Sequence, residues 1–187
     1  MPMIAGKKKR RVAGDPVFSH FNAQHHAKMV DVGTKPVTNR VAIASGRVLM
    51  RQETLTLITS GGTAKGDPLA VAQVAGIMAV KKTPDLIPMC HPLLITGVDI
   101  QFKGVSPKKH IKASSVAFIE IMATVKSSGP TGVEMEALTA VSVAALTLYD
   151  MCKSQDKAIQ ISHIHLLHKR GGKSGVYTAA TRVDDVE

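Results

Sequence analysis

The sequence predicts an α+β fold in which an antiparallel sheet carries its helices on one face. Several stretches alternate apolar and polar residues, as half-buried strands do, and two longer stretches have the starts and stops of helices. The chain has 187 residues, of which 44% are hydrophobic and 20% charged. This length and composition suit one globular domain with a substantial core.

The first strand is expected at 38–50, where β-branched residues occur in an alternating pattern. Gly46 interrupts the alternation, which indicates either a bulge or the close approach of another segment. Gly61-Gly62 then breaks the chain.

A helix is expected to begin at Asp67-Pro68, because aspartate caps free amides and proline fits the first helical position. It is expected to run to about Lys82, where Thr83-Pro84 ends it. The helix is dense in small residues, which predicts close packing against a sheet or another subunit: Ala70, Ala72, Ala75, Gly76 and Ala79.

The remaining elements are two strands joined by a hairpin loop, a second long helix, and a last strand that ends in a glycine-rich loop. They are expected at 95–103, 110–126, 134–153, 158–169 and 171–175, with the hairpin loop at 106–109. The resulting order, β-α-β-β-α-β, is that of the ferredoxin-like fold. One sheet face has no helix to cover its isoleucines and valines, so the chain is expected to be oligomeric.

The net charge of +10 is unevenly placed. Five cations lie at 7–11 in a segment with almost no apolar residues, which favours a solvated tail. A nucleic-acid arm or an organelle-targeting remnant are the alternatives. Residues 1–28 are therefore expected to be a basic, disordered leader, 29–180 the folded domain and 181–187 a tail. Without those five cations the chain still carries about +5, which suits an anionic ligand.

Cys90 and Cys152 lie far apart and form no disulfide framework, which fits a reducing compartment. No stretch approaches the ~20 uninterrupted apolar residues of a membrane span, and no secretory signal is visible. We expect a cytoplasmic protein without a membrane partner. The mitochondrial matrix is the alternative if the leader is a targeting remnant.

The second helix carries the most informative polar residues. Asp150 and Lys153 are i, i+3 neighbours, and Glu136 lies about 40° from Asp150 on the same stripe. An isolated pair of this kind is usually a surface salt bridge. Here the flanking residues are mostly apolar, which predicts partial shielding from water and allows acid–base chemistry: Leu146, Leu148, Met151 and Cys152.

Two histidine-containing segments are weaker candidates. Cys90-His91 stands between Pro88 and Pro92, which predicts a rigid extended connection, with a structural histidine as the alternative. His163, His165 and His168 lack a cysteine partner or a helical zinc motif, so strand-surface histidines are expected and no metal site is.

Cations occur at three separate places: at Lys65, at Lys153 and from Lys169 to Lys173. The loop Gly171-Gly172-Lys173-Ser174-Gly175 has the exposed amides to hold phosphate but is not a Walker motif. A basic RNA-recognition module of similar element order would need aromatic residues on its central strands. Only Phe118 stands there, and aromatic residues are 3% of the chain, so a nucleic-acid partner is not expected.

Several longer blocks, in order, resemble the molybdenum cofactor biosynthesis protein C family of cyclic pyranopterin monophosphate synthases. The resemblance runs from Met29 to Gly175, roughly three quarters of the chain. The blocks are Met29–Val32, Lys65-Gly66-Asp67, Asp85–Leu93, Thr131–Thr139, Leu148–Lys153 and Gly171–Gly175. Val176-Tyr177 departs from the family, which often has an acidic residue and then an aromatic one there.

The resemblance implies conversion of (8S)-3′,8-cyclo-7,8-dihydroguanosine 5′-triphosphate into cyclic pyranopterin monophosphate, with release of pyrophosphate. It also implies a ferredoxin-like hexamer, built as a trimer of dimers, with the active site at a subunit interface. No cofactor is expected. By position, the implied catalytic residues are Asp150, Lys153 and Lys65. The implied substrate-binding or site-lining residues are Met89, Cys90, His91, Glu134, Met135, Glu136, Asp31, Arg40, Lys169 and Lys173.

The residue chemistry agrees with these implications. A triphosphate needs several cations, and rebuilding a purine into a pterin needs repeated proton transfers. The alternative class is a nucleotide hydrolase, with metal assistance through the histidines. Metal analysis and activity in excess chelator distinguish the two.

Overall fold

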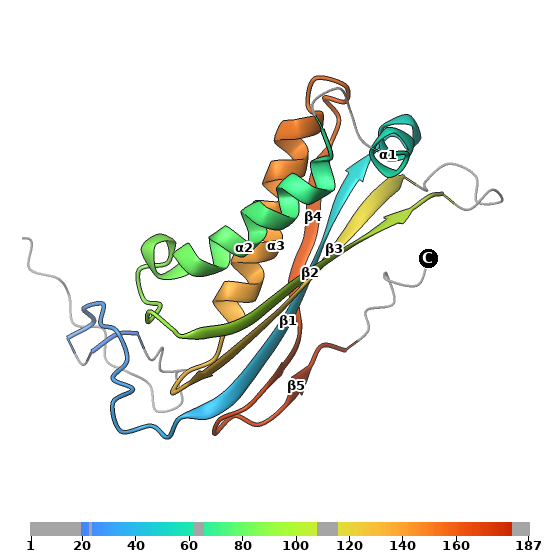
Figure 1. Cartoon of the computed structure of the whole chain (residues 1–187). Helices are drawn as coiled ribbons and strands as arrows, with labels where there is room; N and C mark the ends of the chain where they lie inside the picture. The colour runs from blue at the N-terminus through green and yellow to red at the C-terminus, as the bar shows by residue number, and fades with distance from the viewer. Residues whose placement is uncertain (1–19, 23, 62–65, 108–115, 181–187) are drawn as a thin grey trace, which may run out of the picture. The chain divides into compact units, whose positions relative to one another are not determined.

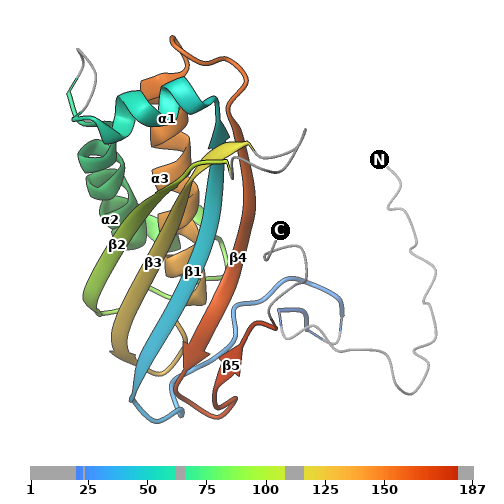
Figure 2. The ribbon, with the colours of Figure 1, turned by 90° about the vertical axis from the view of Figure 1, so that its right-hand side faces the viewer.

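Five strands form one antiparallel sheet in the order β2-β3-β1-β4-β5 (Figure 2). The computed structural model describes residues 20–22, 24–61, 66–107 and 116–180. The strands are β1 (Thr38–Met50), β2 (Ile95–Val105), β3 (Ala117–Gly129), β4 (Gln160–Arg170) and β5 (Tyr177–Thr178). The helices are α1 (Gln52–Thr59), α2 (Pro68–Leu86) and α3 (Glu134–Cys152), and α2 and α3 lie on the same face of the sheet (Figure 1). The predicted α+β class with an antiparallel sheet is confirmed.

The chain divides into two units, Met1–Val30 and Asp31–Glu187. In the first unit the described residues form a small closed turn. Phe21 pairs with Ala27, and the side-chain oxygen of Asn22 accepts hydrogen bonds from the amides of Gln24 and His26. The sheet and the helices belong to the second unit. The cations at 7–11 and the expected tail at 181–187 lie outside the described residues.

Two elements were not expected from the sequence, α1 and β5. The α1 helix has eight residues, too few for a clear period, and its signal is limited to the buried Thr54, Leu55 and Ile58. The β5 strand has two residues, which pair with His168 and Lys169. The expected order of six elements was therefore incomplete.

Element boundaries differ from expectation at one proline and at one strand start. The α2 helix begins at Pro68 with Asp67 as its cap, as predicted, but continues through Pro84 to Leu86. A proline so near the end of a helix removes only one main-chain bond, and the amide of Ile87 still reaches the Thr83 carbonyl (2.9 Å). The β3 strand begins at Ala117, later than the expected 110, and residues 110–115 lie outside the described part.

Alternation along β3 produces the sheet side of the core. Its inward residues are each at most 2% exposed, as predicted: Ala117, Ile119, Ile121, Ala123 and Val125. The α3 helix supplies the opposite side. By length and composition α3 is the one described helix that could cross a bilayer, with 19 residues and a mean hydropathy of 1.3. Half of it is buried inside the protein, which accounts for its apolar composition.

Two glycines bring α3 close to its neighbours. A Cβ at Gly46 of β1 would lie 2.6 Å from the Val141 side chain, so the predicted close approach is confirmed. The β1–β4 register also shifts between Ser45 and Arg47, as expected for a bulge. A Cβ at Gly76 would lie 3.1 Å from the Ala140 carbonyl oxygen, which confirms that the small residues of α2 permit close packing.

A buried carboxylate connects the end of α3 to the start of α1. The side chain of Asp156 is 1% exposed. It accepts hydrogen bonds from the amides of Arg51 (2.8 Å) and Ala158 (3.0 Å) and from the Thr54 hydroxyl (3.2 Å). Burial alone would raise the pKa of Asp156, but these bonds and the Arg51 charge hold it below its usual value. No local pattern in the sequence indicates this connection, because Arg51 and Thr54 lie more than 100 residues from Asp156.

Replacing Gly76 tests the close contact between α2 and α3. Gly76→Val is expected to lower the free energy of unfolding by about 2 kcal/mol, because the added atoms press on the backbone of α3. Lys81→Val, at an exposed position of the same helix, controls for the lower helix propensity of valine. Equal losses in the two variants, measured by denaturant unfolding, would contradict the packing account.

Asp156→Asn tests the buried carboxylate. At pH 7 it is expected to lower the free energy of unfolding by about 2–3 kcal/mol, since it loses charge-assisted bonds. The folded-state pKa of Asp156 lies below its unfolded value, so the carboxylate stabilises the fold above that unfolded value and less as the pH falls past it. The stability gap between wild type and variant should therefore narrow below about pH 4. A gap independent of pH would rule out this role.

Candidate functional site

A cluster of cations lies where the start of β1, the end of β4 and the start of α3 come together. We call it the basic pocket, a cavity of about 280 Å³. Its charged lining residues are Lys35, Arg40, Glu134, Lys169, Arg170 and Lys173. The register of the sheet explains the gathering, because Val41 of β1 pairs with Arg170 of β4. Five cations facing one carboxylate favour an anionic ligand.

Arg40 acts in this pocket as a clamp between two loops. Its guanidinium donates hydrogen bonds to the carbonyls of Gly129 (3.2 Å) and Pro130 (2.9 Å), which lead into α3. A third bond reaches the carbonyl of Gly171 (3.2 Å) in the loop after β4. The residue expected to bind substrate therefore also fixes the shape of the pocket.

The glycines after β4 allow this clamp to close. Gly171 and Gly172 both have positive φ, +105° and +73°. A Cβ at Gly171 would lie 2.4 Å from the Asn39 carbonyl oxygen, and one at Gly172 would overlap the Arg40 guanidinium. Any other residue would be strained and would displace Arg40. The phosphate-holding role expected of this loop is untested, but its backbone lines the pocket together with Lys173 and Ser174.

Glu134 and Lys169 form an ion pair across the pocket. The Lys169 ammonium lies 2.8 Å from a Glu134 carboxylate oxygen, and each side chain is a little over a quarter exposed. A Cβ at Gly132 would overlap the Glu134 carboxylate, so this glycine gives Glu134 the space to reach Lys169. The pair leaves Lys35, Arg170 and Lys173 as further cations of the pocket.

The segment Met89-Cys90-His91 lies at the same end of α3. Cys90 is half-buried, and burial together with the negative charge of Glu136 raises the pKa of its thiol. Glu136 is 2% exposed, and this burial raises the pKa of its carboxyl. A hydrogen bond from its own amide lowers that pKa, whereas the negative charge of Glu134 raises it further. The neighbouring Met135 is 36% exposed. Cys90 and Glu136, far apart in sequence, are thus brought together.

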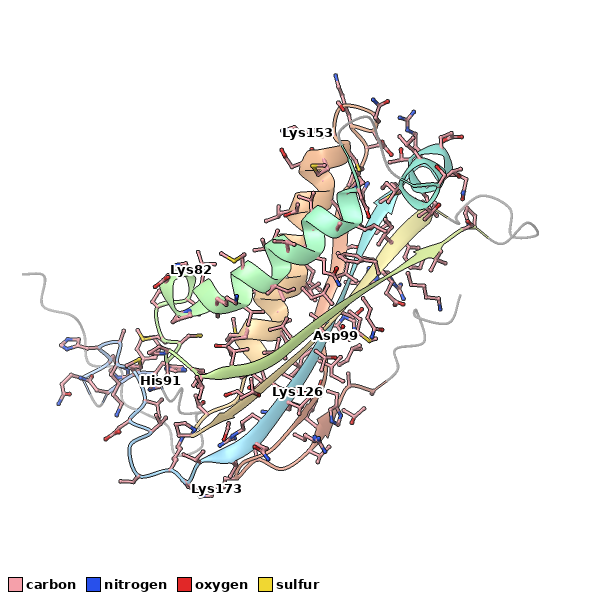
Figure 3. All side chains as sticks on the ribbon, in the orientation of Figure 1. Lys82, His91, Asp99, Lys126, Lys153 and Lys173 are labelled. Atoms are coloured by element: carbon pink, nitrogen blue, oxygen red, sulfur yellow. The ribbon has the colours of Figure 1, made fainter. Side chains whose placement is uncertain are left out.

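Asp150 and Lys153 lie at the other end of α3 (Figure 3). The Lys153 ammonium is 2.6 Å from an Asp150 carboxylate oxygen, and the side chains are 58% and 69% exposed, respectively. The hydrogen bond to Asp150 and then its charge raise the pKa of Lys153. The pair expected from i, i+3 spacing is therefore present, but the expected shielding is wrong for the single chain. Its neighbours Leu146 and Tyr149 also point outward.

Glu136 and Asp150 were expected to share one stripe of α3, but the two side chains differ in exposure. Glu136 is buried near the start of α3, where its charge acts on Cys90, whereas Asp150 is exposed near the end of the helix. Helical angle alone does not report which neighbours cover each turn. Asp31 has a local role, since its carboxylate accepts a hydrogen bond from the amide of Gly33 (2.8 Å).

The third expected catalytic residue, Lys65, lies outside the described residues. The described chain resumes at Gly66 and Asp67, immediately before α2. Figure 1 shows that α2 begins and α3 ends at the same end of the sheet. The sequence neighbours of Lys65 thus lie at the Asp150 end.

The predicted residues form two groups at opposite ends of α3. Sixteen residues separate Glu134 from Asp150, and at 1.5 Å per residue they span about 24 Å. Figure 3 shows Lys153 at one end of the molecule and His91 and Lys173 at the other. Within a single chain the two groups therefore do not meet.

The histidines of β4 make local contacts. Nδ1 of His163 lies 2.8 Å from the Ser162 hydroxyl, and Nδ1 of His168 lies 3.1 Å from the Thr178 hydroxyl. Among the described residues no group of three or more histidine, cysteine, aspartate or glutamate side chains could hold a metal ion. The metal-assisted alternative therefore has no centre in the described part of the chain. Phe118 also carries the Arg47 guanidinium over its ring, 5.0 Å from the centroid.

Sequence reasoning missed two cations of the basic pocket, Lys35 and Arg170. Both stand near strand ends, Lys35 just before β1 and Arg170 at the end of β4. Strand pairing would have indicated their proximity, since the start of β1 lies opposite the end of β4. Residue type alone did not distinguish them from other surface cations.

Comparison with known proteins identifies the family. The model of the MoaC family matches residues 29–172. A protein of Desulfitobacterium hafniense is 59% identical over 158 residues, which cover 84% of this chain and 91% of that protein. A protein of Dinoroseobacter shibae is 56% identical to this chain, over 87% of this chain and 98% of that protein. A protein of Pelotomaculum thermopropionicum is 52% identical, over 86% of this chain and 89% of that protein. All three are named cyclic pyranopterin monophosphate synthase. The chain belongs to the MoaC family.

Proposed function

We propose that this chain converts (8S)-3′,8-cyclo-7,8-dihydroguanosine 5′-triphosphate into cyclic pyranopterin monophosphate and pyrophosphate, as a cyclic pyranopterin monophosphate synthase of molybdenum cofactor biosynthesis. Family membership supports the reaction. The observation that carries the mechanism is the separation of a basic pocket from an acid–base pair by the length of α3.

The basic pocket suits the triphosphate. Lys35, Arg170 and Lys173 add three positive charges beside the Lys169–Glu134 pair. Closing the cyclic phosphate joins a substrate hydroxyl to the α-phosphorus and releases pyrophosphate. The leaving group develops negative charge, which Lys173 and the amides of the adjoining glycine loop are placed to stabilise. At about 280 Å³ the pocket is smaller than the ~300–1,000 Å³ of most ligand sites, so it fits part of a nucleotide.

The Asp150–Lys153 pair suits proton transfer. Asp150 raises the pKa of Lys153, so the exposed ammonium is charged at neutral pH and can donate a proton. It becomes a base only if water is removed or another cation approaches, because both changes lower a lysine pKa. We assign Lys65 to this group from its place before α2. Covering the pair with another surface would supply the missing desolvation.

We propose that a second copy of the chain supplies the surface that covers the Asp150–Lys153 pair. A two-fold, antiparallel arrangement would set the basic pocket of one chain beside the Asp150–Lys153 pair of its partner, completing two equal sites. The outward sides of the helices carry exposed apolar residues suited to this contact: Val71, Val74 and Met78 on α2, and Leu146 and Tyr149 on α3. A trimer of such dimers would give the hexamer.

Two further parts of the assignment are proposed on similar grounds. The order β2-β3-β1-β4, with α2 and α3 on one face, supports a ferredoxin-like domain within residues 29–180, with 1–28 and 181–187 as accessory ends. The free thiols of Cys90 and Cys152 support a reducing, cytoplasmic environment.

Lys153→Ala tests the chemistry. It is expected to reduce product formation at least about a thousandfold, because a proton-transfer group is lost while an exposed side chain contributes little to the fold. Product is measured by mass spectrometry after incubation with the cyclised GTP derivative. Lys157→Ala, at another exposed cation, is the matched control. Turnover near wild type in Lys153→Ala would overturn the assignment.

Mixing two inactive variants tests the shared site. Lys153→Ala and Lys169→Ala damage opposite halves, so a heterodimer holds one site with both defects and one intact site. After equal mixing and subunit exchange, about a quarter of wild-type activity is expected, because half of the dimers are mixed and each has one good site. Lys153→Ala mixed with Asp150→Ala damages the same half and should recover none. No recovery in the first mixture, with exchange verified, would place the whole site in one chain.

A further inference from the structure

We infer that Asp156 is a positioning residue for the Asp150–Lys153 pair. The inference rests on the proposed function of that pair. Asp156 touches neither member; it fixes the turn that follows them to a distant part of the fold.

The turn after Lys153 carries the chain out of α3 and closes the end of the helix on which the pair stands. The amide of Lys153 donates to the Tyr149 carbonyl (2.8 Å), and the amides of Gln155 and Asp156 both donate to the Cys152 carbonyl (2.9 and 3.0 Å). The backbone of Asp156 thus helps to close the last turn of α3. Without such closure a helix end frays.

The side chain of Asp156 holds this turn in place. Its carboxylate accepts a hydrogen bond from the amide of Arg51, at the junction of β1 and α1, and lies 3.4 Å from the guanidinium of the same residue. The Arg51 guanidinium also donates a hydrogen bond to the Gln155 carbonyl. Arg51 is the N-cap residue of α1, but its side chain makes no capping hydrogen bond to the helix amides. Asp156 therefore provides, from more than 100 residues away, the negative charge that suits a helix N-terminus.

The same carboxylate also contacts the first turn of α1. Thr54 lies in the first turn of α1, and its hydroxyl donates to the Asp156 carboxylate (3.2 Å). The chain continues from α1 toward Lys65 and α2. One buried carboxylate thus fixes the end of α3, which carries the acid–base pair, against the helix that precedes the third catalytic residue. The Arg51 guanidinium adds a second link between the same two segments through the Gln155 carbonyl.

The exposure of the pair makes such fixing necessary. The side chains of Lys153 and Asp150 are each more than half exposed, so burial restrains them less than it restrains a core residue. Cys152 beside them is 2% exposed and cannot move outward without opening the core. Burial and the Asp156 charge raise the pKa of its thiol, which keeps it neutral and compatible with the core.

The experiment compares Asp156→Asn with Ile121→Ala in the full-length protein. Ile121→Ala leaves a cavity at a fully buried position of the sheet and destabilises the fold without changing the turn. Assays are run at low temperature and normalised to the folded oligomer. We expect Asp156→Asn to lower kcat about 10- to 100-fold with KM within about twofold of wild type. Ile121→Ala should leave both constants near wild type.

Two readouts separate positioning from stability. The pH dependence of kcat should move to lower pH in Asp156→Asn, because a frayed turn weakens the bond by which Asp150 raises the pKa of Lys153. Hydrogen exchange at the amides of Lys153, Gln155 and Asp156 should accelerate in that variant alone. Thr54→Val, which removes one bond, should show a smaller change of the same kind.

The outcomes are distinct. A wild-type kcat and pH profile in folded Asp156→Asn would overturn the positioning role, even with Lys153→Ala inactive. Equal kcat losses in Asp156→Asn and Ile121→Ala, with unchanged pH profiles, would do the same. An active Lys153→Ala would instead overturn the proposed function, whereas the exchange measurement would still report on the turn.

Discussion

The burial of α3 along the sheet is the constraint on which the rest of the structure depends. This helix supplies one side of the core, and its contacts require glycine at Gly46 and Gly76 where neighbouring elements approach closely. Because α3 is packed along its length, the distance between its two ends is fixed. The groups at its two ends therefore stay about 24 Å apart, and in the proposed mechanism a second copy of the chain brings the two kinds of group together.

Each end of α3 is built by a different device. At the start, the Arg40 clamp and two glycines with positive φ shape a pocket of backbone and cations. At the end, the buried Asp156 fixes a short turn, and the acid–base pair stands outside it in solvent. The pocket end is suited to binding charge, and the exposed end to accepting a partner that removes water. This division of roles is what the proposed dimer uses.

Much of the fold could be predicted because its signals are local. The alternation in β1 and β3, the Asp67-Pro68 start of α2 and the i, i+3 pair on α3 depend on residues close in sequence. Failures occurred where the determining contacts are distant. The α1 helix depends on Asp156, the role of Arg40 depends on carbonyls about 90 and 131 residues away, and the exposure of Asp150 depends on what covers each turn of α3. The resemblance to a family implied which residues belong to the site. Only the three-dimensional structure shows that they lie in two groups at opposite ends of α3.

The most direct test of the shared site is turnover as a function of oligomeric state. The chain is incubated with (8S)-3′,8-cyclo-7,8-dihydroguanosine 5′-triphosphate across a dilution series, with product followed by mass spectrometry and the oligomer fraction by light scattering or mass photometry. Turnover per chain should fall in proportion to the fraction of dimers or larger oligomers and vanish in the monomer. A monomer that forms product at the full rate, or no product at any concentration, would contradict the account.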